Sequence, residues 1–307
     1  GAGYVKANGG NAHDVSNLGS GGGGRIAVYY GSLDGFDLGS QISAAGGTAG
    51  SDGGAGTIYL KDKAQDVGEL HIKGNSTSGV TPLSGMVEEQ VYISNVRLDL
   101  LEGAEFTQNI IGTGKVIPHG RFVVPSDHLV VDGWELTLNG EYSFAGLDLV
   151  NGGTLVQTSA STYDSEKLTL TVDNMQIDSS SGINLDGRGI TGQGVVPDTS
   201  AGGSYGGKGG NGYGSSIEPY GVEEYKTPTY FGTGGADNVY NRGGGSVKLV
   251  VNNELTLDGY ISANGIRRAG HAMPGGSGGS IWIDATTISG AGYVKANGGN
   301  AHDVSNL

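Results

Sequence analysis

The stretch GAGYVKANGGNAHDVSNL occupies residues 1–18, and the same stretch occupies residues 290–307. Chance does not produce an identity of this length. The offset between the copies is 289 residues, which favours one period of a tandem array plus an overlap into the next copy. A short duplicated segment is the alternative. If the array interpretation holds, the residues that follow Leu307 begin GSGGGGRIAVYY, as residues 19–30 do.

The composition favours an ordered, β-rich protein with an acidic surface. The 307 residues include 62 glycines, which cluster between β-rich runs and show no G-x-y period, so collagen is excluded. Asp and Glu number 31 against 17 Lys and Arg, and the net charge of −14 disfavours nucleic acid as a partner. Cysteine is absent, as an exported chain allows, and no apolar run is long enough to span a bilayer.

Hydrophobic residues alternate with period two, which indicates β-strands. The runs recur as a two-part motif. A short strand ends in an Asn, Asp or Gly turn, and a glycine cluster then leads into a second strand. The short strands with their turns are expected at 5–9, 42–46, 183–187 and 261–265, and the second strands at 24–28, 56–60, 245–249 and 279–283.

The spacing of this motif predicts a parallel β-solenoid. Ile261 and Val294 are 33 residues apart, and Val5 and Ile42 are 37 residues apart. A unit of this size cannot bury a core of its own, so it must stack on its neighbours. Alternation along each strand predicts which side chains form inward ladders, namely Ile261, Ala263, Ile281 and Ile283. The same alternation predicts outward positions, such as Ser262 and Trp282.

The rest of the chain is expected to continue the same architecture, as one unit from residue 1 to residue 307. Further strands are predicted at 69–72, 90–93, 96–100, 129–131, 135–138 and 154–157. Residues 188–244 interrupt the pattern as an inserted loop rich in glycine and tyrosine. A compact β-sandwich is the alternative fold, but it would need longer strands at regular spacing and would break at the junction between copies.

Several phrases resemble the glycine-rich β-helix repeats of giant bacterial surface and adhesin-like proteins. The matching stretches are ISANG at 261–265, GGSGGSIWI at 275–283, AGYVKANGG at 291–299, GGGGRIAVYY at 21–30, AGTIYL at 55–60 and GGSYGGKGG at 202–210. The resemblance implies a right-handed parallel β-helix in a long extracellular polypeptide. It is specific for architecture rather than for function, and residues 85–150 depart from it.

Five aspartates in glycine-rich turns are candidate calcium ligands, because calcium prefers carboxylate and carbonyl oxygens. They are Asp14 (repeated as Asp303), Asp52, Asp186, Asp198 and Asp237. No complete Asp-x-Asp-x-Asp-Gly loop is present in the sequence. Ca²⁺ is therefore the candidate cofactor, and a purely conformational role of Asp in turns stays open.

Aromatic residues gather in the insertion and form the candidate contact surface. They are Tyr205, Tyr213, Tyr220, Tyr225, Tyr230, Phe231 and Tyr240. Tyrosine rings can stack on sugar rings or pack against another chain. The alternative is that they give the loop a small core of its own, since a loop of this length needs packing to be ordered.

The charged clusters carry no recognisable catalytic motif, and no residue is assigned a catalytic role. Carboxylates gather at 88–89, 99–105 and 223–224, where solvated surface charge is the simpler interpretation. The only local basic cluster contains Arg267, Arg268 and His271. It could hold an anionic sugar or a carboxylate of a neighbouring unit, and a solvated loop is the alternative.

Together these features predict a structural and adhesive repeat of a long extracellular or cell-surface fibre, not an enzyme. Adjacent copies stacked end to end are the expected partners, and sister fibres, cell-surface glycans or neighbouring cells are further candidates. Membrane insertion is not expected within this segment. A polysaccharide-active β-helix enzyme would instead show convergent carboxylates, and a carbohydrate-binding module would use the tyrosine-rich loop. Tandem copies would multiply contact without a strong single site.

Overall fold

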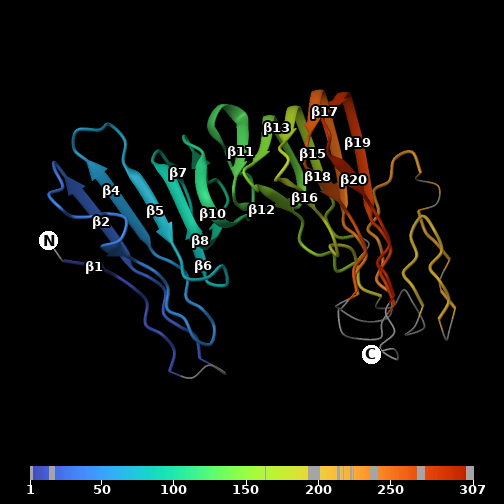
Figure 1. Cartoon of the computed structure of the whole chain (residues 1–307), viewed down its shortest axis with the longest axis horizontal. Coiled ribbons are helices and arrows are strands. Elements are labelled where there is room, and N and C mark those ends of the chain that lie inside the picture. The colour runs from blue at the N-terminus through green and yellow to red at the C-terminus, as the bar shows by residue number, and fades with distance from the viewer. Residues whose placement is uncertain are drawn as a thin grey trace. The chain divides into compact units, whose positions relative to one another are not determined.

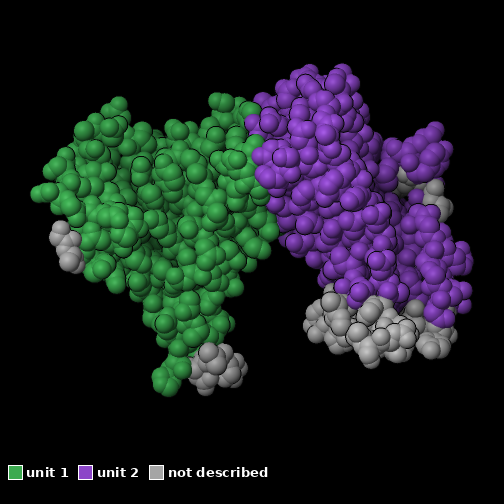
Figure 2. Space-filling model, viewed as in Figure 1, with its two compact units in different colours: residues 1–137, 150–153 green, residues 138–149, 154–307 purple. Residues whose placement is uncertain are grey.

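A computed structural model describes residues 3–13, 18–162, 164–192, 201–212, 215–216, 218–221, 223, 225–235, 241–267 and 274–301. The chain forms two compact units, coloured separately in Figure 2. The first unit is Gly1–Thr137 with Val150–Gly153, and the second is Leu138–Leu149 with Thr154–Leu307. Strands dominate both units, and the one helix of the described residues is a three-residue 3₁₀ turn, Pro125–Asp127 (η1). The described part of the chain holds no helix that could cross a membrane.

Parallel pairing prevails in the first unit (Figure 1). Its strands are β1 (Val5–Lys6), β2 (Arg25–Tyr30), β3 (Ile42–Ser43), β4 (Thr57–Asp62), β5 (Glu69–Lys73), β6 (Val80–Leu83), β7 (Met86–Val87), β8 (Gln90–Leu100), β9 (Glu105–Phe106), β10 (Ile110–Pro118), β11 (His128–Asp132) and β12 (Glu135–Thr137). β1 pairs with β3, β2 with β4, and β8 with β10, all in parallel. Among the described residues of this unit, β4 and β5 form the antiparallel exception.

Two parallel ladders run through the second unit (Figure 1). The long strands β13 (Gly140–Val150), β15 (Leu168–Ile177), β17 (Ser246–Leu257) and β19 (Ser280–Ser289) pair in that order. The short strands β14 (Thr154–Val156), β16 (Gly182–Asn184), β18 (Tyr260–Ser262) and β20 (Tyr293–Lys295) pair in the same order. Each long strand is thus followed by a short one, and we call such a pair a layer. The predicted all-β, parallel architecture is confirmed at this level.

The register confirms the spacing read from the sequence. Val294 pairs with Ile261, and Val5 pairs with Ile42, which are the two relationships that the motif predicted. Ile183 and Ile261 occupy one column of the short-strand ladder and are fully buried. Because aliphatic side chains recur at the same position in successive layers, each layer completes the core of its neighbour.

At three positions the burial differs from what the alternation predicted. Ser262 is buried, with 5% of its surface exposed, although the alternation predicted an outward, exposed position. It pairs with Asn184 on one side and Lys295 on the other. Strands lie about 4.8 Å apart, so a small side chain between two neighbouring strands exposes little surface even where the alternation points it outward.

Ile281 and Ile283 are only half-buried, in contrast to the fully buried Ile261 and Ala263. Both lie in β19, which is the last strand of its ladder among the described residues. Among the described residues, β19 has β17 on one edge and no strand on the other. The side chains of Ile281 and Ile283 therefore lack a following layer to cover them, which the prediction of full burial required.

At four of the turns from a short strand to the next long strand, a glycine precedes the long strand. The glycine N–H donates to the carbonyl oxygen of the residue just after the short strand, at N–O distances of 2.6–2.8 Å: Gly24 to Ala7, Gly56 to Ala44, Gly245 to Leu185, and Gly279 to Ala263. The residue before this glycine is also constrained, since a Cβ at Gly278 would overlap the carbonyl oxygen of Ala296. The glycine clusters therefore allow backbone to pack directly on backbone.

Most strands predicted from alternation are present, two predicted runs merge into one strand, and five observed strands were not predicted. The runs at 90–93 and 96–100 form a single strand, β8, which bends at Asn95 (φ 48°). The sequence pattern missed the short strands β6, β7 and β9 and the long strands β10 and β13. β10 contains Gly112 and Gly114, both at positive φ, where its register with β8 shifts. These bulge glycines interrupt the alternation that would have revealed the strand.

We expect a position with a layer on both sides and a position in the last described layer to respond unequally to truncation. Ile261→Ala removes a fully buried side chain between two layers and should lower the free energy of unfolding by about 3 kcal/mol. Ile281→Ala lies in the last layer and should cost less than half as much. Urea denaturation of both variants tests this order, and equal losses would contradict the layer assignment.

Candidate functional site

The insertion at 188–244 leaves and rejoins the second unit at one place. Its two ends are joined by a hydrogen bond from Gly189 N to Gly243 O, at 2.8 Å. The Arg242 guanidinium donates from Nη1 to the carbonyl oxygens of Ala160 (2.9 Å) and Gly189 (3.0 Å). The insertion is therefore anchored at its base by backbone pairing and by one arginine.

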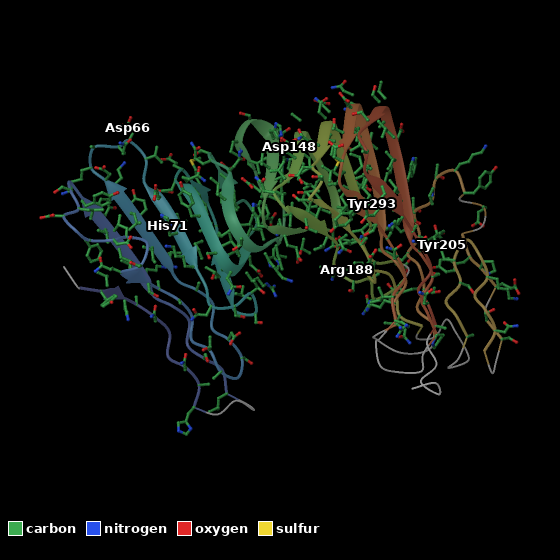
Figure 3. The ribbon with its side chains drawn as sticks, in the orientation of Figure 1. Asp66, His71, Asp148, Arg188, Tyr205 and Tyr293 are labelled. Atoms are coloured by element: carbon green, nitrogen blue, oxygen red, sulfur yellow. The ribbon has the colours of Figure 1, made fainter. Side chains whose placement is uncertain are left out.

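Part of the predicted aromatic contact surface packs on itself. The ring centres of Tyr205 and Tyr220 are 5.2 Å apart, and those of Tyr220 and Tyr230 are 5.8 Å apart. The Tyr205 hydroxyl lies 2.5 Å from Ser280 Oγ at the start of β19, and Tyr205 is labelled in Figure 3. The Tyr220 hydroxyl donates to the carbonyl oxygen of Phe231. These contacts fit the alternative in which the aromatics give the insertion a small core.

The other predicted aromatics differ in their surroundings. Phe231 is buried with Ala160 and Ile190. Tyr225 is 78% exposed, with the Lys226 ammonium 5.7 Å from its ring centre. Tyr213 and Tyr240 lie outside the described residues. Of the described candidates, Tyr225 is the one that presents most of its ring to solvent.

A glycine-lined groove with a volume of 760 Å³ lies between part of the insertion and two later segments of the second unit. Its walls come from three segments, at 202–212, 274–279 and 296–301. Backbone and small side chains line it almost throughout, with Tyr205 and Lys208 as the larger exceptions. We call it the glycine groove. Such a surface offers peptide N–H and C=O groups rather than charged side chains.

The turns after the short strands carry a column of Asn and Asp side chains. Asp186 Oδ1 accepts the N–H of Asn264 at 2.7 Å, and Asn264 Oδ1 accepts the N–H of Asn297 at 2.8 Å. In the first unit, Asn8 Oδ1 accepts the N–H of Ala45 at 3.0 Å. Each side chain thus links one layer to the next at the same corner.

The predicted calcium ligands are not brought together among the described residues. Asp52 lies in the first unit and Asp186 in the second, and Asp14, Asp198 and Asp237 lie outside the described residues. Within the described ranges, no three His, Cys, Asp or Glu side chains gather where they could hold a metal. Both carboxylate oxygens of Asp186 accept hydrogen bonds from Asn264, one from the Asn264 backbone N–H and the other from Asn264 Nδ2 at 3.1 Å. This geometry favours the conformational role for Asp186.

Residues Arg97, Asp99 and His119 form a charged cluster in the first unit that the sequence reasoning missed. Arg97 Nε and Nη2 lie 2.7 and 3.0 Å from the two oxygens of Asp99. His119 Nε2 lies 2.7 Å from Asp99 Oδ2. Arg97 and Asp99 occupy alternate positions of β8, so they share one face, and this spacing was the available signal. His119 follows β10, the strand that the sequence pattern missed.

The pKa of Asp99 lies below its ordinary value. Burial alone would raise it, and this is the largest single effect, but hydrogen bonds from Arg97 and His119 together outweigh it. A lowered pKa favours the ionised carboxylate in the folded protein. The cluster therefore stabilises the fold through a charged Asp99, and it contains no group placed as an activated nucleophile.

Asp99→Asn should destabilise the chain by about 2 kcal/mol at neutral pH, since Arg97 and His119 lose a charged acceptor. The folded pKa is lowered, so the contribution is present above the unfolded pKa of about 3.9 and is lost as pH falls through the folded value. Urea denaturation between pH 7 and pH 3 should show the gap between variant and parent closing in acid. The exposed Glu102→Gln serves as the matched control, and a gap independent of pH would contradict the assignment.

The remaining charged candidates lie at the surface or outside the described residues. Glu102, Glu105 and Glu223 are exposed, which fits solvated surface charge. Of the basic cluster, Arg267 is half-buried, while Arg268 and His271 lie outside the described residues. None of these positions adds a convergent pair of carboxylates to the glycine groove.

Comparison with protein-family models, with curated proteins and with solved structures finds no match to this chain. Functional inference therefore rests on the geometry and on the internal repeat.

Proposed function

We propose that the chain is a structural and adhesive repeat of a long extracellular or cell-surface fibre, built as a right-handed parallel β-helix. Its role is mechanical, giving reach and repeated contact rather than catalysis. The observation that carries this proposal is the behaviour of the repeated segment, whose two copies form hydrogen bonds along opposite edges.

In the first copy, odd-numbered residues form the hydrogen bonds to the strand that follows. The N–H groups of Val5, Ala7 and Gly9 donate to the carbonyl oxygens of Gln41, Ser43 and Ala45, at 2.8–2.9 Å. These acceptors lie in and around β3, the strand that follows β1 in its ladder. The corresponding positions of the second copy are Val294, Ala296 and Gly298.

In the second copy, the hydrogen bonds go to the preceding strand and come from the residues that alternate with Val294, Ala296 and Gly298. Tyr293 N donates to Gly259 O, Lys295 O accepts from Ala263 N, and Asn297 O accepts from Gly265 N, at 2.8–3.0 Å. These residues face β18, the strand that precedes β20 in its ladder. Alternate residues of a parallel strand direct their N–H and C=O groups to opposite edges. One segment can therefore join the β18 layer of one period to the β3 layer of the next.

The layered construction supports the same proposal. Spacings of 33 and 37 residues return the chain to its own ladder, and every layer depends on its neighbours for burial. A continued array leaves few open strand edges, which limits uncontrolled aggregation. Surface contacts, such as those of Tyr225, would recur once per period and would add avidity. An acidic chain without cysteine is compatible with an extracellular location.

A chain with two periods, residues 1–307 followed by a second 19–307, tests the proposal. We expect it to unfold at a higher urea concentration than one period, with a steeper transition, because the junction satisfies both edges of the shared segment. The matched control carries a flexible Gly/Ser linker at the junction, which should restore the midpoint of one period. A two-period chain with the midpoint and slope of one period would contradict the proposal.

A further inference from the structure

The glycine groove lies next to a strand edge that has no hydrogen-bond partner among the described residues. Ala296, Gly298 and Gly299 line the groove, and Val294, Ala296 and Gly298 point their N–H groups away from β18. We call this the forward edge of the second copy. Tyr293, on the same strand, is labelled in Figure 3.

The first copy shows what occupies the same surface. Its residues Ala7, Gly9 and Gly10 correspond to Ala296, Gly298 and Gly299. The glycine cluster at 21–24 covers them: Gly21 N donates to Gly10 O at 2.9 Å, and Gly24 N donates to Ala7 O at 2.6 Å. The identical atoms are thus covered in one copy and line an open groove in the other.

The space around the corresponding glycines, Gly9 and Gly298, also differs between the two copies. A Cβ placed on Gly9 would overlap the carbonyl oxygen of Gly21 and approach Gly22. Among the described residues, a Cβ placed on Gly298 would meet only Gly276 O, at 3.7 Å, which is an ordinary contact. The described residues therefore require glycine at position 9 but leave space for a side chain at position 298.

The corner column also ends at this surface. The backbone N–H of Asn297 donates a hydrogen bond to Asn264 Oδ1, at 2.8 Å. In the first copy, the corresponding Asn8 side chain accepts from Ala45 N and from Ser43 Oγ, at 3.0 and 2.6 Å. The Asn297 side chain would offer the same acceptor to a β3 strand placed after β20.

We propose that the glycine groove and the forward edge receive a second, separate copy of this chain by strand exchange. The N-terminal segment of the incoming chain leaves its own β3 and glycine cluster. Residues 290–307 of the first chain, identical in sequence, take its place. The hydrogen bonds broken and formed are the same, so the exchange resembles domain swapping and has a low energetic cost.

This inference rests on the proposed repeat function but goes beyond it, because the contact forms between chains that are not covalently joined. Exchange of identical segments changes little free energy, so the parent chain should associate only weakly. Loosening the first copy from its own β3 should favour association. Filling the space at position 298 should prevent it.

Gly9→Ala and Gly298→Ala make the same change in the two copies and should have opposite effects. In sedimentation velocity, Gly9→Ala should raise the association constant of the full chain at least tenfold, because the Cβ displaces the N-terminal segment. Gly298→Ala should stay monomeric with an unchanged melting temperature. The double variant Gly9→Ala/Gly298→Ala should also be monomeric. Association of the double variant equal to that of Gly9→Ala would overturn the proposal, as would a folded, monomeric Gly9→Ala.

A peptide experiment keeps the test decisive if Gly9→Ala does not fold. A fluorescent peptide of residues 1–18 should exchange into the parent chain on β3, and the same peptide with Gly9→Ala should not. Binding of both peptides, or of neither, would overturn the proposal. So would retention of the chain on an immobilised glycan that Gly298→Ala abolishes without any self-association, which would assign the groove to carbohydrate. If the two-period chain shows added stability while these experiments fail, the repeat function stands and the exchange between chains does not.

Discussion

Backbone hydrogen bonding between successive layers is the interaction on which the structure depends. A layer contains one long and one short strand, which is too little to enclose a core. Its N–H and C=O groups and its aliphatic side chains are satisfied only by the layers before and after it. The parallel register of Ile183, Ile261 and Val294 shows this dependence in one column. Stability of this kind is shared along the ladder rather than held in a single core.

Glycine makes the close stacking possible where the chain turns from a short strand toward the next long one. At these positions the backbone of one layer touches the backbone of the next, as at Gly278 and Ala296, so no side chain can be accommodated. The Asn and Asp corners add a specific bond at each step, from Asp186 to Asn264 and on to Asn297. Glycine content and turn chemistry thus serve the architecture directly, and they also shape the groove beside the insertion.

Much of the architecture could be predicted because its signals are local and periodic. Strand alternation and the spacings of 33 and 37 residues needed no knowledge of distant contacts, and the register of Val294 and Val5 agrees with both. Burial was harder to predict, since Ser262 lies between strands β16 and β20, which its local alternation does not reveal. β10 was missed because bulge glycines disrupt its alternation. The Arg97–Asp99–His119 cluster depends on that strand, so it could not be assembled from sequence. The candidate ligand and metal residues stay predictions, apart from the packing roles seen for Tyr205, Tyr220 and Asp186.

The most direct test is amide hydrogen exchange in the two copies of the repeated segment, compared between a one-period and a two-period chain. In one period, the amides of Val5, Ala7 and Gly9 should be protected, while those of Val294, Ala296 and Gly298 exchange quickly despite their identical sequence. In two periods, the amides of Val294, Ala296 and Gly298 at the junction should become as protected as those of Val5, Ala7 and Gly9 in the first copy. Equal protection of the two copies in one period, or no gain in protection at the junction, would contradict the stacking of periods through a shared segment.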